Sequence, residues 1–179
     1  MININNSLLL IIDIQEKLLK VTAEKDLLVE NTIKLIKGLK ALDIPIVWVE
    51  QNPEKMGETT TEIAQELSGV KKFSKSSFSC FGDDSIREYI HEMDVDNVIV
   101  CGIESHVCVY QTVRDLLDDD YMVEIAVDCV SSRNLANKEI AVKRMVEEGA
   151  DRTSVEMILF ELLQNFKHPE FKTISSIIK

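Results

Sequence analysis

The chain has 179 residues and a mass of 20.3 kDa, with 45% hydrophobic and 28% charged residues, a balance that predicts one globular domain over residues 1–179. Its formal net charge of −11 repels phosphate backbones, so we expect no nucleic-acid partner. No apolar run reaches the roughly 18 to 20 residues that span a bilayer, so we expect no membrane partner either.

The cysteines and histidines show no metal-binding or disulfide pattern. The four cysteines, Cys80, Cys101, Cys108 and Cys129, have no C-x-x-C spacing, which is typical of free thiols in a reducing compartment. The N-terminus lacks a basic segment before its apolar run, so we expect no secretory signal and a cytoplasmic location. No two of the three histidines have metal-ligand spacing, so we expect no structural zinc site.

The first predicted element is a buried strand, Ser7–Ile14, whose run of consecutive apolar residues is typical of a strand covered on both faces. A helix over about Asp26–Leu42 and a second strand, Ile46–Glu50, complete a right-handed βαβ unit. Asp13 lies at the carboxyl end of the first strand, where ligands bind in open α/β sheets. Taken alone, this aspartate is better explained as the cap of the next turn.

The segments that follow are predicted to be polar loops around a short helix near residues 61–67. Gln51–Thr61 reads as a loop at the same edge of the sheet. Val70–Ser79 carries three lysines in five positions, which is ordinarily a solvated surface. Because Phe73 and Phe78 bracket Lys75, we expect this loop to pack inward and to carry the Lys75 ammonium into the crevice.

The stretch Asn97–Tyr110 joins a predicted central strand to a helix. Val98–Cys101 is a short apolar run, and a helical pattern begins near Ser105. Cys108 falls in the first turn of that helix, where the dipole and free N–H groups favour a thiolate. His106 is two positions away, and side chains at i and i+2 on a helix point in different directions.

The C-terminal part alternates one more strand with helices. We expect a strand over Tyr121–Val127, a loop over Asp128–Arg133, and a helix over Asn137–Glu148 that ends at Gly149. Thr153 has the spacing of a capping box for a helix with one apolar stripe that reaches Phe166. Core packing and an oligomer contact explain that stripe equally well. A last helix begins near His168–Pro169.

Four of these segments resemble the isochorismatase-like cysteine hydrolases, in the branch of small isochorismatase-domain proteins. Leu9–Gln15 (Leu-Leu-Ile-Ile-Asp-Ile-Gln) is similar to the family's opening motif, and Lys75–Ser79 (Lys-Ser-Ser-Phe-Ser) to its Lys-x-x-Phe-Ser element. Gly102–Val109 (Gly-Ile-Glu-Ser-His-Val-Cys-Val) resembles the cysteine motif, and Asp128–Arg133 the Asp-Ala-x-Ser-Ser-Arg loop. The resemblance covers nearly the whole chain. It implies an α/β fold, a three-layer α/β/α domain with a mostly parallel, Rossmann-like six-stranded sheet.

The resemblance also implies a catalytic triad. Asp13 would be the general base, Cys108 the nucleophile, and Lys75 the cation that holds the pair. The oxyanion would bind the backbone N–H groups of Glu104 and Cys108, beside a non-proline cis peptide bond between Ile103 and Glu104. Asp128 and Arg133 would fix their loop rather than take part in the chemistry.

The segment after the second strand departs from the nicotinamidase-type members of this superfamily, which place Asp and His metal ligands there. This chain has Glu50, Gln51, Asn52 and Glu54 at that place and no histidine nearby. We therefore expect no metal and no cofactor.

The function that we favour is a metal-independent cysteine hydrolase, which opens a small amide-like (C–N) or related substrate through a Cys108 thioester. Two alternatives stay open: an isochorismatase-type vinyl-ether hydrolase, which needs no covalent thiol, and a catalytically idle oligomeric scaffold. The resemblance and the apolar helix stripes predict a homo-oligomer, a dimer or higher. Some relatives are described as ribonucleases, but the acidic charge argues against an RNA substrate.

Overall fold

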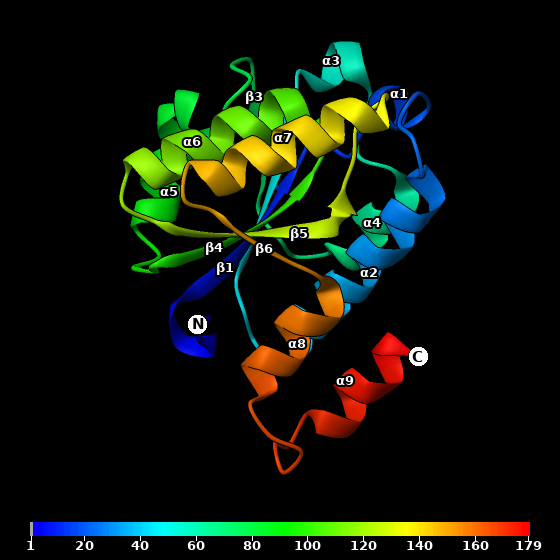
Figure 1. Ribbon diagram of the computed structural model, residues 1–179. Coiled ribbons are helices and arrows are strands. Elements are labelled where there is room, and N and C mark those ends of the chain that lie inside the picture. The colour runs from blue at the N-terminus through cyan, green and yellow to red at the C-terminus, as the bar shows by residue number, and fades with distance from the viewer. Residues whose placement is uncertain (1) are drawn as a thin grey trace.

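A parallel sheet of six strands forms the middle layer of the protein (Figure 1). The computed structural model describes residues 2–179. The strands lie in the order β3-β2-β1-β4-β5-β6, and every neighbouring pair is parallel. Their bounds are β1 Ser7–Ile12, β2 Ile46–Gln51, β3 Lys72–Lys75, β4 Asn97–Gly102, β5 Met122–Val130 and β6 Asp151–Thr153.

Helices cover both faces of the sheet, which confirms the predicted three-layer α/β/α class. In Figure 1, α5, α6 and α7 lie over one face, and α2, α4 and α8 lie over the other, with α9 packed on α2 and α8. The longer helices are α2 Lys25–Ala41, α5 Asp84–His91, α6 Tyr110–Asp118, α7 Leu135–Glu147, α8 Val155–Leu163 and α9 Phe171–Ile178. The shorter helical segments are η1 Ile4–Asn6, α1 Glu16–Leu19, α3 Pro53–Met56, α4 Thr61–Glu66, η2 Cys80–Gly82 and η3 Ser105–Val109.

The two central strands, β1 and β4, are buried at every position because both faces of the sheet are covered. Side chains alternate between the two halves of the core: Leu9 and Ile11 pack on the α2 side, and Leu8 and Leu10 on the α6 side. The chain runs outward from β1 through β2 to β3, then returns to β4 and runs outward through β5 to β6. The carboxyl ends of β1 and β4 therefore form the topological switch point, where open α/β sheets bind their ligands.

Gly102 lets the two central strands approach closely at this switch point. Its φ of +139° is in a region that favours glycine, and a Cβ at this position would lie 2.1 Å from the carbonyl oxygen of Ile12. The next residue, Ile103, donates its N–H to the same oxygen at 3.0 Å. The residues after β1 and after β4 are thereby held side by side.

Two expectations about the sheet were wrong in detail, and one strand was not located in the sequence. The segment 70–79, predicted to be a loop, contains the edge strand β3, whose four residues are too few to show a clear alternation. Strand β5 continues to Val130, so Asp128 and Cys129 lie in a strand and not in a loop. The family resemblance implied six strands, but the residues of β6 were not identified, because only three residues pair with β5.

Other local expectations also differ from the structure. Gln51 belongs to β2, and the predicted loop after it contains α3. The cap of α8 is Ser154, whose hydroxyl accepts the N–H of Met157, and Thr153 ends β6 instead. Phe166 lies beyond α8 and is 72% exposed, and Phe78 is exposed where we expected it to pack inward. In residues 2–179, no helix combines the length and the apolar character needed to cross a membrane.

Candidate active site

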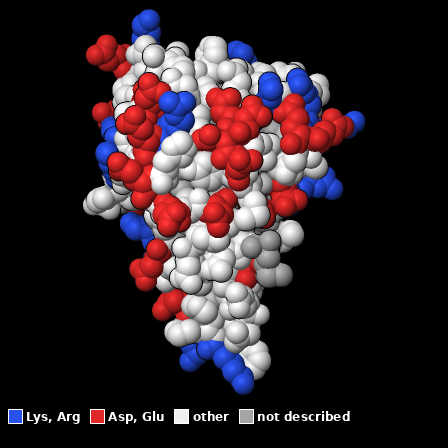
Figure 2. All heavy atoms as spheres, turned by 90° about the vertical axis from the view of Figure 1, so that its left-hand side faces the viewer, with Lys and Arg blue, Asp and Glu red and all other residues white. Residues whose placement is uncertain are grey.

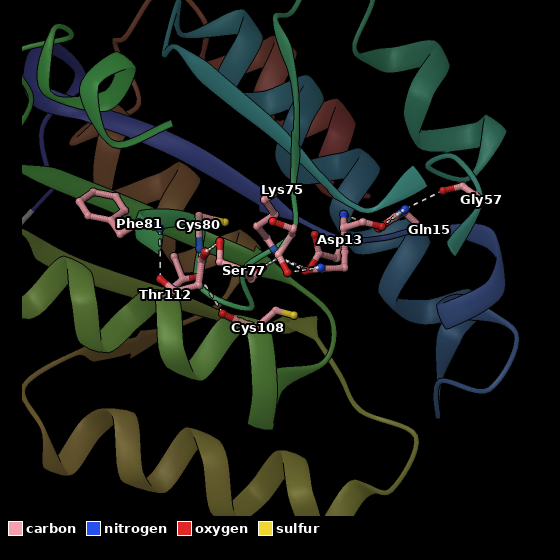
Figure 3. A network of polar contacts seen from close by, with 12 residues as sticks. Asp13, Gln15, Gly57, Lys75, Ser77, Cys80, Phe81, Cys108 and Thr112 are labelled. Atoms are coloured by element: carbon pink, nitrogen blue, oxygen red, sulfur yellow. Dashed lines mark hydrogen bonds and ion pairs between the residues drawn. The ribbon is translucent and has the colours of Figure 1, made fainter. Parts of the chain in front are cut away.

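Three side chains from distant parts of the sequence meet at the carboxyl edge of the sheet (Figure 3). Asp13 directly follows β1, Lys75 is the last residue of β3, and Cys108 lies in η3, the π-helical turn that follows β4. The Lys75 ammonium lies 2.8 Å from Oδ2 of Asp13, and both side chains are fully buried. The Cys108 thiol is a polar neighbour of the Asp13 carboxylate and is 7% exposed. The structure therefore brings together the three residues that the sequence predicted for catalysis.

The Lys75 ammonium is fully hydrogen-bonded. It donates to Oδ2 of Asp13 at 2.8 Å, to Oε1 of Gln51 at 2.7 Å and to the carbonyl oxygen of Ser77 at 3.3 Å. An ammonium has three N–H donors, so these acceptors use all of them. The cation is held in one orientation, with its charge directed at the aspartate.

Asp13 is held in an unusual backbone conformation. Its φ of +55° lies in the left-handed region, its N–H donates to the carbonyl of Val49 at 3.1 Å, and its own carbonyl accepts the N–H of Gln15 at 2.7 Å. Within residues 2–179, Oδ1 of the carboxylate accepts no hydrogen bond, although it is buried. One oxygen of the aspartate is thus tied to Lys75, and the other is free to take a proton.

Burial decides the protonation of the site. It raises the pKa of Asp13, and the nearby positive charge of Lys75 opposes that rise only in part. Burial lowers the pKa of Lys75, but the negative charge of Asp13 and the two neighbouring thiols reverse the direction, so its pKa is raised. Burial, followed by the charge of Asp13, raises the pKa of the Cys108 thiol, and Lys75 counteracts this in part. The sequence predicted a helix terminus that favours the thiolate; in the structure desolvation outweighs it, so the resting thiol carries its proton.

The other three cysteines are less accessible than Cys108. Each is fully buried, and burial raises the pKa of each thiol, for Cys80 to about 12. Cys80 lies in η2, not in a loop, and its N–H donates to the hydroxyl of Thr112 at 3.0 Å. That hydroxyl in turn donates to the carbonyl of Cys108 at 2.7 Å. Thr112 therefore anchors the turn that carries the candidate nucleophile.

The peptide bond between Ile103 and Glu104 is cis, at the position that the family resemblance implied. The carbonyl of Glu104 accepts the N–H groups of Val107 and Val109, at 3.0 and 3.3 Å, and so starts η3. The Glu104 side chain turns toward Arg133, whose backbone N–H and Nε lie 3.2 and 3.3 Å from Oε1. The role of the Glu104 and Cys108 N–H groups as an oxyanion hole stays a prediction.

His106 and Asp128 make contacts outside the candidate site. The His106 ring contacts the hydroxyl of Ser132 at 3.0 Å and the side-chain amide of Asn137 at 3.5 Å, which places it against α7. The Asp128 carboxylate accepts the N–H of Val155 through both oxygens at 3.1 Å and so holds the start of α8.

The last two residues of β2 are engaged in contacts of their own. Oε1 of the buried Glu50 accepts the N–H and hydroxyl of Thr59 at 2.7 and 2.8 Å, and Oε2 lies 3.3 Å from the Lys72 ammonium. Gln51 binds Lys75, as described above. Within residues 2–179, no three His, Cys, Asp or Glu side chains are grouped so that they could hold a metal ion.

Sequence reasoning assigned no role to two glutamines near Lys75: Gln51, which binds its ammonium, and Gln15, which binds the backbone of Gln51. Gln15 is fully buried and Gln51 is partly buried. The available signal was weak: each is a neutral polar residue that closely follows the apolar run of a strand.

The doubly wound α/β fold and its match to the isochorismatase domain support a protein of the hydrolase class. The chain belongs to the isochorismatase family, since the family model for the isochorismatase domain matches residues 7–157. It is 36% identical to the secreted isochorismatase effector Isc1 of Phytophthora sojae, over 98% of this chain and 85% of the relative. It is 34% identical to isochorismatase domain-containing protein 2 of Xenopus laevis, over 97% and 83%. The solved structure of MAR1 ribonuclease from Caenorhabditis elegans is 34% identical, with a TM-score of 0.94 over 99% of this chain and 91% of that one.

Proposed function

We propose that the protein is a metal-independent cysteine hydrolase that cleaves a small amide-like (C–N) or related substrate through a thioester on Cys108. The observation that carries this proposal is the buried Asp13–Lys75 pair beside the one cysteine that reaches the surface. A thiol needs a base nearby to act as a nucleophile at neutral pH, and a carboxylate becomes an adequate base when burial raises its pKa. Asp13 meets both conditions.

The reaction would proceed in two halves. Asp13 takes the thiol proton as the sulfur of Cys108 adds to the substrate carbonyl, and the N–H groups of Glu104 and Cys108 bind the oxyanion. The C–N bond breaks, the amine leaves with the proton from Asp13, and a thioester remains. Asp13 then takes a proton from water, which attacks the thioester and releases the acid and the thiol. Lys75 stays protonated throughout and balances the negative charge of the site.

The vinyl-ether alternative remains the second enzymatic candidate, because that chemistry needs no covalent thiol. The match to the isochorismatase domain does not distinguish the two reactions. Turnover of a vinyl-ether substrate by Cys108→Ala would favour this alternative, whereas loss of all turnover in the same variant favours the thioester.

The surface charge of this protein argues against ribonuclease activity, the activity in the name of the relative from Caenorhabditis elegans. Figure 2 shows Asp and Glu side chains crowded over the upper part of one face, and they include the exposed acids of α5 and α6. Such a surface repels the phosphate backbone of RNA. Single-stranded RNA nevertheless belongs in the assay as a substrate.

We also propose that the protein forms a homo-oligomer. The predicted stripe of α8 is used by the core, because Val155, Ile158 and Leu162 are buried. Other apolar side chains of α7 and α8 remain outside, including Ile140, and Met157 at 58% exposure. A second copy of the chain would remove this apolar surface from water.

Intact-protein mass spectrometry during incubation with a panel of small amides tests the main proposal. We expect an added acyl mass on the wild-type protein, mapped to Cys108, and none on Cys108→Ala. Cys129→Ala is the matched control, since this thiol lies in the opposite half of the core. Turnover of an amide with no adduct on rapid quenching, and with full activity in Cys108→Ala, would exclude the thioester.

A further inference from the structure

We propose that Gln51 is a positioning residue of this site: its side-chain carbonyl holds the Lys75 ammonium against Asp13, and Gln15 holds Gln51. This inference rests on the proposed function, because it assigns a task within the same site. The family resemblance includes Gln15 in its opening motif but assigns no role to either glutamine. Hydrogen bonds link Gln15 to Gln51 and Gln51 to Lys75. Figure 3 labels Gln15, Lys75 and Asp13 of this group.

Lys75 needs such support because of where its strand lies. β3 is a four-residue strand at the edge of the sheet, two strands away from β1, which Asp13 follows. The Lys75 side chain must therefore cross β2 to reach the carboxylate. In the parallel pairing of β2 and β3, Gln51 is the direct partner of Lys75, so both side chains project from the same face. Gln51 thus lies beneath the path of the lysine.

The orientation of the Gln51 amide follows from its other contact. Its Nε2 donates to the carbonyl oxygen of Ser76 at 2.9 Å, and its Oε1 accepts from Lys75 at 2.7 Å. A flipped amide would direct Nε2 at an ammonium and Oε1 at a carbonyl, and both contacts would become repulsive. The loop after β3 therefore sets which end of the amide faces the lysine.

Gln15 fixes the backbone of Gln51. Its Oε1 accepts the N–H of Gln51 at 2.8 Å, and its Nε2 donates to the carbonyl of Gln51 at 3.0 Å and to that of Gly57 at 2.6 Å. The side chain of Gln15 thus pairs with β2 as a neighbouring strand would. Since the N–H of Gln15 binds the carbonyl of Asp13, a chain of hydrogen bonds links the aspartate to the residue that orients its lysine.

A neutral amide is the group that suits this place. An acceptor oxygen favours the charged form of Lys75 without taking the cation away from Asp13. A carboxylate at position 51 would compete with Asp13 for the ammonium and would add negative charge beside the Asp13–Lys75 pair, which acts on the Cys108 thiol. Both effects disfavour the thiolate, so the thiol should ionise at higher pH.

The test measures the rate of Cys108 alkylation by iodoacetamide as a function of pH, with the labelled residue mapped by peptide mass spectrometry. We expect Gln51→Glu to raise the pH midpoint by about one unit, which slows alkylation about tenfold below the midpoint, since a nearby like charge shifts a pKa by a unit or more. Gln51→Met should also slow alkylation, because the ammonium loses an acceptor. Gln65→Glu adds the same charge on the exposed side of α4 and should leave rate and midpoint unchanged.

Each outcome decides between the two claims. If wild-type Cys108 is not the thiol labelled first, the proposed function fails, and the inference with it. If wild-type Cys108 is labelled first but both Gln51 variants keep the wild-type rate and midpoint, only the positioning role is overturned. Gln51→Glu preserves the shape of the side chain and the backbone contacts with Gln15. If Gln51→Met does not fold, the midpoint of Gln51→Glu therefore decides alone.

Discussion

Replacing Lys75 by methionine should show how much the buried Asp13–Lys75 ion pair contributes to the stability of the fold. The substitution keeps most of the side-chain volume and removes the charge. Asp13 would then be a fully buried carboxylate without its ion-pair partner Lys75. Its Oδ1 already lacks a hydrogen-bond partner in residues 2–179. Removal of one partner from a buried pair costs about 3 to 5 kcal/mol, because the other charge stays buried and uncompensated.

The loss should be visible in thermal unfolding followed by circular dichroism. In a domain of 150 to 250 residues, 1 kcal/mol shifts the Tm by about 2 to 4 °C, so we expect Lys75→Met to unfold roughly 6 to 20 °C lower at pH 7. Lys172→Met is the matched control, since this lysine of α9 is exposed. The double variant Asp13→Asn/Lys75→Met should recover part of the loss, because no charge remains buried.

The pH dependence of the Tm difference between wild type and Lys75→Met provides an independent check on the direction of this effect. Burial already raises the folded-state pKa of Asp13, and loss of Lys75 raises it further above the unfolded value of about 3.9. A carboxyl group with a raised folded pKa destabilises the fold at high pH, and this penalty disappears as the pH falls through the folded pKa. The Tm difference between wild type and Lys75→Met should therefore shrink from pH 7 to pH 5. A difference no larger than that of Lys172→Met, or one that grows on acidification, would refute the reasoning.

Four further predictions concern the chemistry and the assembly. Cys108 should be alkylated before the other thiols, with a rate that still rises above pH 9, because burial raises its pKa above the 8.5 or so of a free thiol; preferential labelling of Cys80 would point to a different site. Asp13→Asn should keep the fold and lose turnover, since an amide cannot accept the proton, and full turnover would rule out Asp13 as the base. Activity should survive exhaustive chelation, and loss in chelator with recovery in zinc would contradict a metal-independent reaction. Light scattering at micromolar concentration should give at least a dimer mass, and a monomer mass would contradict the oligomer.

The sequence, read with its family resemblance, predicted the layers of the fold and the three residues that meet at the switch point. The apolar runs of β1, β2 and β4 are unambiguous because strands covered on both faces exclude polar residues. The motifs around Asp13, Lys75 and Cys108 are local, so each could be recognised within a few residues of sequence. The Ile103–Glu104 cis bond could likewise be placed from its motif.

Short elements at the sheet edges could not be predicted, because their pairing depends on residues that are distant in the chain. β3 is defined by its register with β2, and β6 by three residues that pair with β5. The cap of α8 is Ser154 and not Thr153, because Thr153 is already used by β6. In each case a tertiary contact selects between two local patterns of similar quality.

The environment of the site was decided by the tertiary structure alone. Motifs identify a thiol, an acid and a lysine, but desolvation depends on everything packed around them. Only the fold therefore shows that burial raises the pKa of Cys108, although the helix terminus was expected to lower it. Gln51 comes to bind Lys75 because β2 lies between β3 and β1 in the sheet, although 24 positions separate the two residues in sequence. Hydrogen bonds of this kind follow from strand order and register, which a one-dimensional pattern does not contain.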